Sequence, residues 1–290
     1  MSIALALARA AHLASLLILF GSESVQALFR AQIPNPPVIP LPASTPIWLA
    51  ALALATAVLW FFLAAGMMAD SAMPLGPAAI WTVAKDTLFG RVFLVRLALL
   101  ALLLIVVIRW ELHSLRIALV GAALVAIALT SHAAARGDPR FMLARAANDS
   151  LHLLAAGFWI GGLALLVPLV RVNRNTPKAL LAPLQLFSSW GMAAVALLIV
   201  AGSINAWLIL HGAPAGVSLA YAGLLAGKIV LASLMVALAL SNRLGLLPEL
   251  GKDPNASAAS LISSTLAELI LGLVIVLIVG FLGTMSPLMG

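Results

Sequence analysis

Three histidines lie within apolar stretches of this sequence, where an ionisable side chain is costly unless it has a partner or a function. They are His12, His132 and His152. Near the same predicted membrane face lie several methionines, of which Met67, Met68 and Met285 are the candidate ligands. Imidazole and thioether groups without thiolate suit copper, above all Cu(I), so we predict a copper site formed by these six side chains. Taken singly, each histidine equally fits an interhelical hydrogen bond, and each methionine fits core packing.

Five further ionisable residues lie inside the apolar stretches or at their edges, where they would support such a site or line a path below it. They are Glu23, Arg96, Asp149, Lys228 and Glu268. Asp149 lies one turn before His152, where a carboxylate suits a helix N-terminus and would orient the imidazole. Glu23 and Glu268 would be steps of an ion path below the outer site. The alternative is that these charges only form pairs that hold the helices together.

The composition excludes most other kinds of protein. Of 290 residues, 64% are hydrophobic and only 9% are charged, too few polar groups to cover a soluble globule. The absence of cysteine excludes disulfides, iron–sulfur clusters and thiolate catalysis. No hydrolase or nucleotide-binding motif is found, so we predict neither an enzyme nor an ATP-driven pump. In a membrane protein, the net charge of +7 indicates orientation and lipid contact rather than nucleic-acid binding.

Long apolar runs without period-two alternation predict an all-α, polytopic membrane protein, because a lipid-facing backbone must satisfy its own hydrogen bonds. A spanning helix needs about 20 mostly apolar residues, and eight segments qualify. We treat residues 1–290 as one integral-membrane domain. The predicted spans are Ile3–Phe29, Pro46–Met68, Phe89–Ile108, Ser114–Ala133, Asp149–Val170, Ser188–Leu210, Leu219–Leu240 and Thr265–Thr284.

The distribution of positive charge predicts how these spans are oriented. An even number of spans places both termini on one side of the membrane. The predicted loops on the opposite side carry more Lys and Arg than those on the terminal side. Since positive residues collect in cytoplasmic loops, we predict that both termini lie outside.

The two halves of the chain share weak internal similarity, which predicts a tandem repeat of two four-helix halves over about residues 1–135 and 145–290. His12 and His152 each precede a glycine by nine residues, and a basic residue in each half follows an aromatic one by seven. Four helices per half give both halves the same orientation, related by a pseudo-twofold axis along the membrane normal. The two histidines would then lie at similar depth and face each other across the axis.

At these residues the sequence resembles the CopD/PcoD family of copper-resistance inner-membrane proteins. The most specific match runs from His152 to the stretch Trp159-Ile160-Gly161-Gly162-Leu163. The resemblance implies a bacterial inner-membrane protein that moves copper between periplasm and cytoplasm together with a periplasmic CopC-like partner. The termini predicted above to lie outside would then be periplasmic. Ala222 departs from the family, which often has glycine after the tyrosine. Other matching stretches are Phe89-Gly90-Arg91 with Arg96, Ser131-His132-Ala133, Asp149, Tyr221 with Lys228, Asn242-Arg243, and Glu268 with Leu282-Gly283 and Pro287.

Three functions fit this sequence. The leading one is copper transport, in which copper binds the outer histidines and passes between the two halves toward the cytoplasm. A second is a haem-binding redox protein with His12 and His152 as opposed ligands, which a Soret band would reveal. A third is a non-transporting membrane partner of a periplasmic copper chaperone, which would carry no metal into sealed vesicles.

Overall fold

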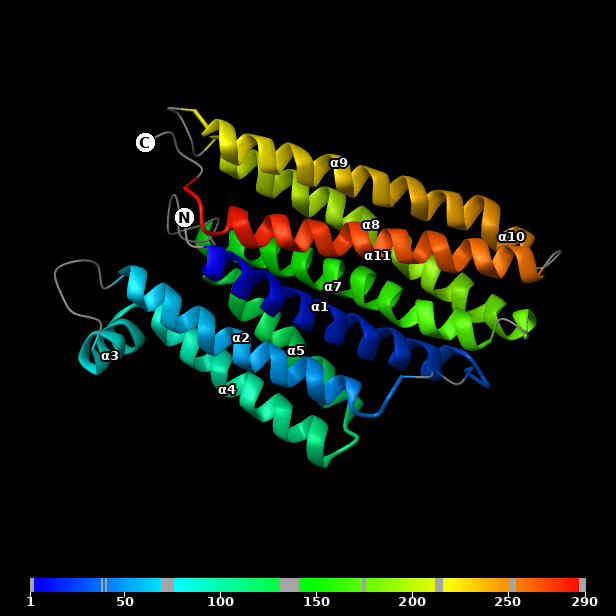
Figure 1. Ribbon diagram of the computed structural model, residues 1–290, viewed down its shortest axis with the longest axis horizontal. Helices are drawn as coiled ribbons and strands as arrows, with labels where there is room; N and C mark the ends of the chain where they lie inside the picture. Colours follow the sequence, from blue (N-terminus) through cyan, green and yellow to red (C-terminus); the bar gives the residue numbers. More distant parts are fainter. Residues whose placement is uncertain are drawn as a thin grey trace.

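The computed structural model describes residues 3–37, 39, 41–68, 76–130, 141–173, 176–211, 216–250 and 254–286. These residues form helices joined by short connections, and no β-strand occurs among them (Figure 1). The all-α prediction is therefore confirmed for the part of the chain that the structure describes.

Successive long helices run in opposite directions along one bundle (Figure 1). They are α1 (Ile3–Gln32), α2 (Thr45–Met68), α3 (Pro77–Asp86), α4 (Leu88–Arg109), α5 (His113–Ala128), α7 (Met142–Val172), α8 (Pro177–His211), α9 (Leu219–Ser241), the π-helical turn η2 (Asn242–Leu246), α10 (Leu247–Glu249) and α11 (Pro254–Leu282).

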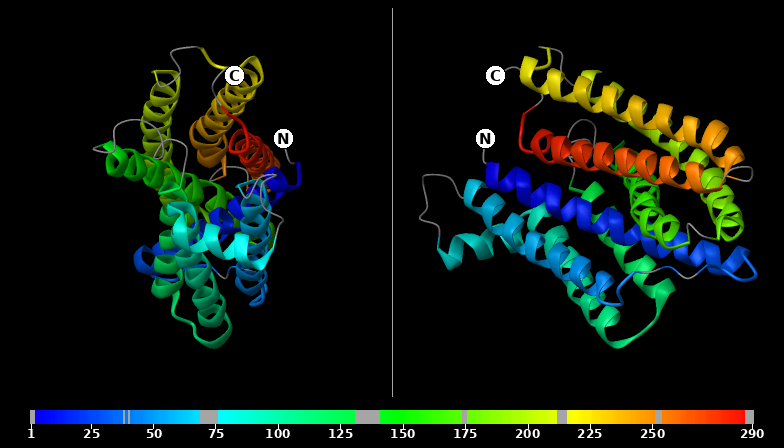
Figure 2. Two further views of the ribbon diagram at one scale, coloured as in Figure 1. Left: turned by 90° about the vertical axis from the view of Figure 1, so that its left-hand side faces the viewer. Right: turned by 45° about the vertical axis from the view of Figure 1, so that its right-hand side comes forward.

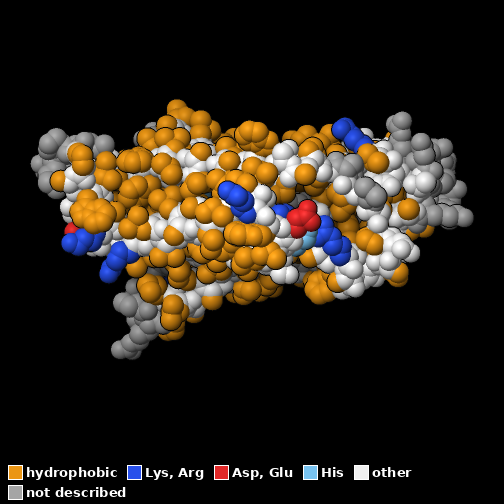
Figure 3. All heavy atoms as spheres, turned by 90° about the horizontal axis from the view of Figure 1, so that it is seen from below, with side chains coloured by type: hydrophobic (Ala, Val, Ile, Leu, Met, Phe, Trp, Pro, Cys, Tyr) orange, Lys and Arg blue, Asp and Glu red, His pale blue; other side chains and the backbone are white. Residues whose placement is uncertain are grey.

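Seven of the described helices are apolar and long enough to cross a membrane, and hydrophobic side chains cover much of the surface (Figure 3). The eighth candidate, α5, has 16 residues in the described part, whereas a full crossing needs about 20. Eight complete spans are therefore not confirmed. α1 begins and α11 ends at the same end of the bundle (Figure 1), which agrees with an even number of crossings.

Two helices begin well before their predicted spans. α8 begins at Pro177 rather than Ser188, and α11 begins at Pro254 rather than Thr265. Proline fits the first turn of a helix, because the N–H that it lacks has no intrahelical partner there. Hydropathy marks only the apolar part of a helix, so these more polar first turns lie outside the predicted boundaries.

α1 and α7 pack against each other at the centre of the bundle, with α2, α4 and α5 on one side and α8, α9 and α11 on the other (Figures 1 and 2). Gly21 of α1 lies directly against Gly157 and Gly161 of α7. A Cβ placed on Gly21 would lie 2.0 Å from the carbonyl oxygen of Gly157. Residues without side chains let the two backbones approach this closely. The contact leaves no room for a passage between the two halves at this depth.

Each central helix has similar neighbours within its own half. α1 packs on α2 and α5, and α7 packs on α8 and α11. α4 packs on α5 as α9 packs on α11. The halves differ in one respect, because α2 and α4 pack together whereas the described residues of α8 and α9 hardly touch. A tandem repeat predicts such an arrangement of neighbours, and the repeat itself stays a prediction.

Candidate functional site

His152 lies on α7 with its ring against α8. Its Nδ1 atom is buried and has no hydrogen-bond partner, while the ring interacts with the carbonyl of Leu198. Gly202 of α8 makes room for the ring, since a Cβ at that position would lie 3.2 Å from Cε1 of His152. An imidazole with one free ring nitrogen is a metal ligand, so His152 has the chemistry to hold copper.

Asp149, one turn before His152, is held in place from α8. The side-chain amide of Asn205 donates to Oδ1 of Asp149 at 2.6 Å. Asn148 in turn donates to Oδ1 of Asn205 at 2.7 Å and to the carbonyl of Ala201 at 3.0 Å. This network joins α7 to α8 and fixes the position of the carboxylate near the histidine.

Lys228 of α9 lies within electrostatic range of both His152 and Asp149. A positive charge beside the histidine opposes a bound cation, and the negative charge of Asp149 offsets it. Three of the sequence-predicted site residues, Asp149 and His152 of α7 and Lys228 of α9, thus lie close to one another.

A cavity of about 520 Å³ extends from His152 and Lys228 into the second half of the bundle. Its mostly apolar walls come from α7, α8, α9 and α11. Ile199 of α8 and Ile229 of α9 line the cavity and are 56% and 54% exposed, respectively. The cavity therefore opens to the outer surface of the bundle between α8 and α9, the two helices that hardly touch.

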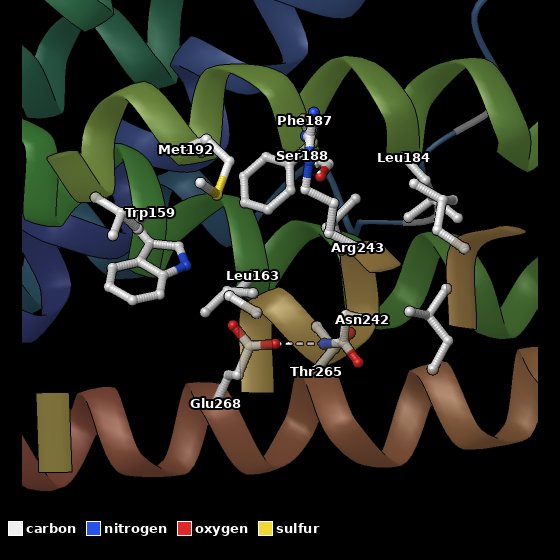
Figure 4. Close-up of a pocket in the computed structure, with 16 residues that line it drawn as sticks. Trp159, Leu163, Leu184, Phe187, Ser188, Met192, Asn242, Arg243, Thr265 and Glu268 are labelled. Atoms are coloured by element: carbon white, nitrogen blue, oxygen red, sulfur yellow. Dashed lines mark hydrogen bonds between the residues drawn. The ribbon is translucent and has the colours of Figure 1, made fainter. Parts of the chain in front are cut away.

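A smaller pocket of about 70 Å³ lies next to this cavity, since Trp159 and Val195 line both spaces. Figure 4 shows this smaller pocket with Trp159 in its wall. Glu268 of α11 is 2% exposed and lines the smaller pocket. Its carboxylate accepts a hydrogen bond from the side-chain amide of Asn242 (Figure 4). The second half therefore contains a series of spaces with an imidazole at one end and a carboxylate at the other.

Asn242 belongs to the π-helical turn η2, which follows α9. Turns of this kind are frequent at functional sites, because they redirect side chains that a regular α-helix would place elsewhere. The next residue, Arg243, donates from a guanidinium nitrogen to Oγ of Ser188 on α8 at 2.8 Å. The turn thus connects α9 to α8 and α11 beside the smaller pocket.

His12 lies in a different place, fully buried between α1 and α2. Its Nδ1 donates to the carbonyl of Ala53 at 2.9 Å, and its Nε2 is buried without a partner. The ring lies edge-on to Trp60, with 5.6 Å between ring centroids. The guanidinium carbons of Arg9 and Arg96 lie 4.5 and 4.4 Å from the centroid of the same indole. Two positive charges so close disfavour a metal cation at His12.

The described contacts do not bring His12 and His152 into one site. The ring of His12 contacts α2, whereas the ring of His152 contacts α8 and borders the cavity. The third histidine, His132, lies outside the described residues. Among the residues that the structure describes, no group of three or more His, Asp or Glu side chains could hold a metal ion.

The three predicted methionine ligands lie near the ends of helices. Met67 and Met68 end α2 and are 54% and 52% exposed. Met285 follows α11 and is partly exposed. A copper site formed jointly by the three histidines and these methionines stays a prediction.

Glu23 is paired rather than free. Its carboxylate lies 2.8 Å from Nδ1 of His113 and 3.5 Å from a guanidinium nitrogen of Arg116, both on α5. Arg116 also donates to the carbonyl of Trp110 at 2.8 Å. These contacts tie α1 to the start of α5. Opposite charges within two apolar helices are the sequence signal for this pair, which was not predicted.

Replacing Glu23 by glutamine is expected to lower the free energy of unfolding by about 3 kcal/mol, because buried Arg116 loses its counter-charge. Thermal unfolding of the purified protein measures the change. Glu111→Gln is the matched control, since Glu111 is exposed in the connection between α4 and α5. Equal melting temperatures for the two variants would contradict a stabilising role for the pair.

Several polar partners around the site were also missed from the sequence. Asn205 and Asn242 hold the two carboxylates, and Gly202 accommodates the imidazole. Uncharged amides within apolar helices signal interhelical hydrogen bonds, as charged residues in such helices do.

Two family models match this chain. "Copper resistance protein D-like, N-terminal domain" matches residues 1–142, and "Copper resistance protein D" matches residues 181–282. The chain is 29% identical over 212 residues to inner membrane protein YebZ of Escherichia coli (strain K12), covering 72% of each protein. It is 33% identical over 178 residues to copper resistance protein D of Pseudomonas syringae pv. tomato, covering 58% of this chain and 57% of that protein.

A shorter match reaches copper transport protein CutJ of Bacillus subtilis (strain 168). The two are 33% identical over 90 residues, which are 30% of this chain and 16% of that protein. No solved structure matches the chain.

The fold and its buried polar groups define a multi-pass helical membrane protein with a cavity inside its second half. The described helices alone do not show what this protein binds. The two family models together match residues 1–142 and 181–282, and the chain belongs to the copper resistance protein D family. The resemblance found in the sequence is thus confirmed, and the relative named an inner membrane protein supports the same location for this chain.

Proposed function

We propose that this protein binds copper at His152 and carries it through the second half of the bundle to the cytoplasmic side. One observation carries the proposal: the cavity beside His152 and the pocket beside Glu268 share Trp159 and Val195 as walls. An imidazole with a free Nδ1 would receive the ion, and a buried carboxylate would receive it next. Membership of a copper resistance family supports copper as the cargo.

The second half of the bundle suits a cation better than the surroundings of His12 or the space between the two halves does. At His12, the guanidinium groups of Arg9 and Arg96 oppose a metal ion. Between the two halves, the backbone contact of Gly21 with Gly161 closes the space. The route inside the second half therefore replaces the route between halves that the sequence suggested.

Copper would be delivered at the outer end of the bundle, with both termini of the chain on the periplasmic side. The exposed thioethers of Met67 and Met68, together with Met285 and His132, would collect copper from a periplasmic CopC-like protein and pass it toward His152. This part of the proposal rests on the family resemblance and on the position of these methionines at helix ends.

Copper uptake into proteoliposomes tests the site. With a copper-sensitive dye inside the vesicles, His152→Ala is expected to reduce the initial rate of Cu(I) uptake at least about tenfold, because the receiving ligand is lost. His12→Ala is the matched control and should retain most of the rate. Copper bound by the purified protein, expected at about one ion per chain, should fall with His152→Ala alone. Unchanged uptake and binding in that variant would refute the assignment of His152.

A haem held between His12 and His152 gains no support from the geometry. The two rings contact different helices, and His12 already donates to Ala53. An absorption spectrum of the purified protein checks this, and we expect no Soret band.

A further inference from the structure

Two arginines of the first half lie against one tryptophan in the interior of the bundle. Arg96 of α4 is 1% exposed, and its guanidinium carbon lies 3.7 Å from the ring centroid of Phe93 and 4.4 Å from that of Trp60. Arg9 of α1 lies over the same indole at 4.5 Å. The ring of His12 approaches Trp60 from α1 as well, edge-on. We call these five side chains the arginine–tryptophan cluster.

The hydrogen-bonding groups of this cluster are largely unsatisfied. All three guanidinium nitrogens of Arg96 are buried and have no hydrogen-bond partner. The Nε atom of Arg9 and the Nε2 atom of His12 are buried and unpartnered too. Among the described residues, no carboxylate forms an ion pair with either guanidinium. The cluster therefore concentrates two positive charges without a negative one from the described part of the chain.

Two other cations in the described helices lie near a carboxylate. Arg116 lies beside Glu23, and Lys228 lies in electrostatic range of Asp149. Cation–π contacts with Trp60 and Phe93 attract a guanidinium, but they do not replace the hydrogen bonds that it made in water. A charge buried in this way is normally paired, and the described part of the chain supplies no such partner for Arg96.

We propose that the arginine–tryptophan cluster binds a small monovalent anion between Arg9 and Arg96. The planar guanidinium groups offer several N–H donors to one anion, and His12 lies beside them. Arg96 is 1% exposed and packed against aromatic rings, which favours a small anion such as chloride over a lipid phosphate group. Arg9 is partly exposed and lies against Gly283 at the end of α11, so the cluster is near the surface on this side.

Thermal unfolding in different salts tests the proposal. Purified wild-type protein is compared in sodium gluconate and sodium chloride at equal ionic strength. Chloride is expected to raise the melting temperature by about 3 °C, because an anion that binds only the folded state stabilises it. Arg96→Met keeps an unbranched chain against the aromatic rings but removes the charge. It should show no rise in chloride and, in gluconate, should equal or exceed the wild type.

Arg109→Gln is the matched control, since Arg109 lies on the same helix and is exposed. Its melting temperature should rise in chloride as the wild type's does. A rise that persists in Arg96→Met, or its absence from the wild type, would overturn the proposal.

A second measurement decides the matter if Arg96→Met fails to fold. The difference in fluorescence between the wild type and Trp60→Phe is the part that Trp60 contributes. Iodide should quench this part in the wild type, and chloride should compete with the quenching. Iodide quenching of that component without competition by chloride would also count against the site. The copper route lies in the other half, so failure here leaves the proposed function untouched.

Discussion

Replacing Gly161 by leucine is expected to leave no folded, monodisperse protein after purification. A Cβ at this position would lie 2.6 Å from both the Cα of Gly21 and the carbonyl oxygen of Leu17, and 2.7 Å from the carbonyl oxygen of Ile18. All three are backbone atoms of α1, so no rotation of a side chain relieves the clash. The two central helices would have to separate, which removes the contact on which both halves depend.

Overpacking of an ordinary core position costs about 1–3 kcal/mol. Separating α1 from α7 affects two whole helices, so the loss should exceed that range and show as aggregated protein on size-exclusion chromatography. Gly227→Leu is the matched control, because a Cβ at Gly227 of α9 meets no atom within 4 Å. This variant should elute as the wild type does. Wild-type elution and melting temperature for Gly161→Leu would show that the close helix contact is not required.

The same glycines show what could be predicted from the sequence and what could not. Gly21 and Gly161 each follow a histidine by nine residues, which marked them as signs of an internal repeat. The structure places them against each other, as the contact between the two halves. Spacing along one chain identifies equivalent positions, but it does not say which helix a position faces.

The helices themselves were largely predictable, because burial in lipid requires long apolar runs and leaves few other structures possible. α5 is the exception among the described helices. It has 16 residues there, so its predicted span of Ser114–Ala133 is not confirmed as a full crossing. Helix starts were also missed where polar first turns precede the apolar run, as at Pro254 of α11.

The site was predictable in part. Asp149, His152 and Lys228 were selected as costly residues in apolar helices, and they lie together. The expectation that His12 faces His152 depended on rotation about the helix axis, which changes by 100° per residue and is set by packing. The cavity was not predictable at all, since it arises from the separation of α8 and α9.

Glu268→Gln is expected to lower copper uptake at least about tenfold while copper binding at His152 is retained. Glutamine keeps the size of the side chain, and its carbonyl oxygen still accepts a hydrogen bond from Asn242. The substitution removes the negative charge and one of the two acceptor oxygens, which Asn242 and Trp159 contact. In the buried pocket that charge is what attracts a cation away from the imidazole. A tenfold change corresponds to about 1.4 kcal/mol, which is modest for a charge at a buried site.

Glu249→Gln is the matched control, because Glu249 is exposed in α10 and lies outside both the cavity and the pocket. It should transport copper at the wild-type rate. The comparison separates two steps, since His152→Ala should remove binding and uptake together whereas Glu268→Gln should remove uptake alone. If Glu268→Gln transports normally while His152→Ala does not, copper enters at the imidazole but leaves by a different way. If both variants transport normally, the cavity of the second half is not the copper route.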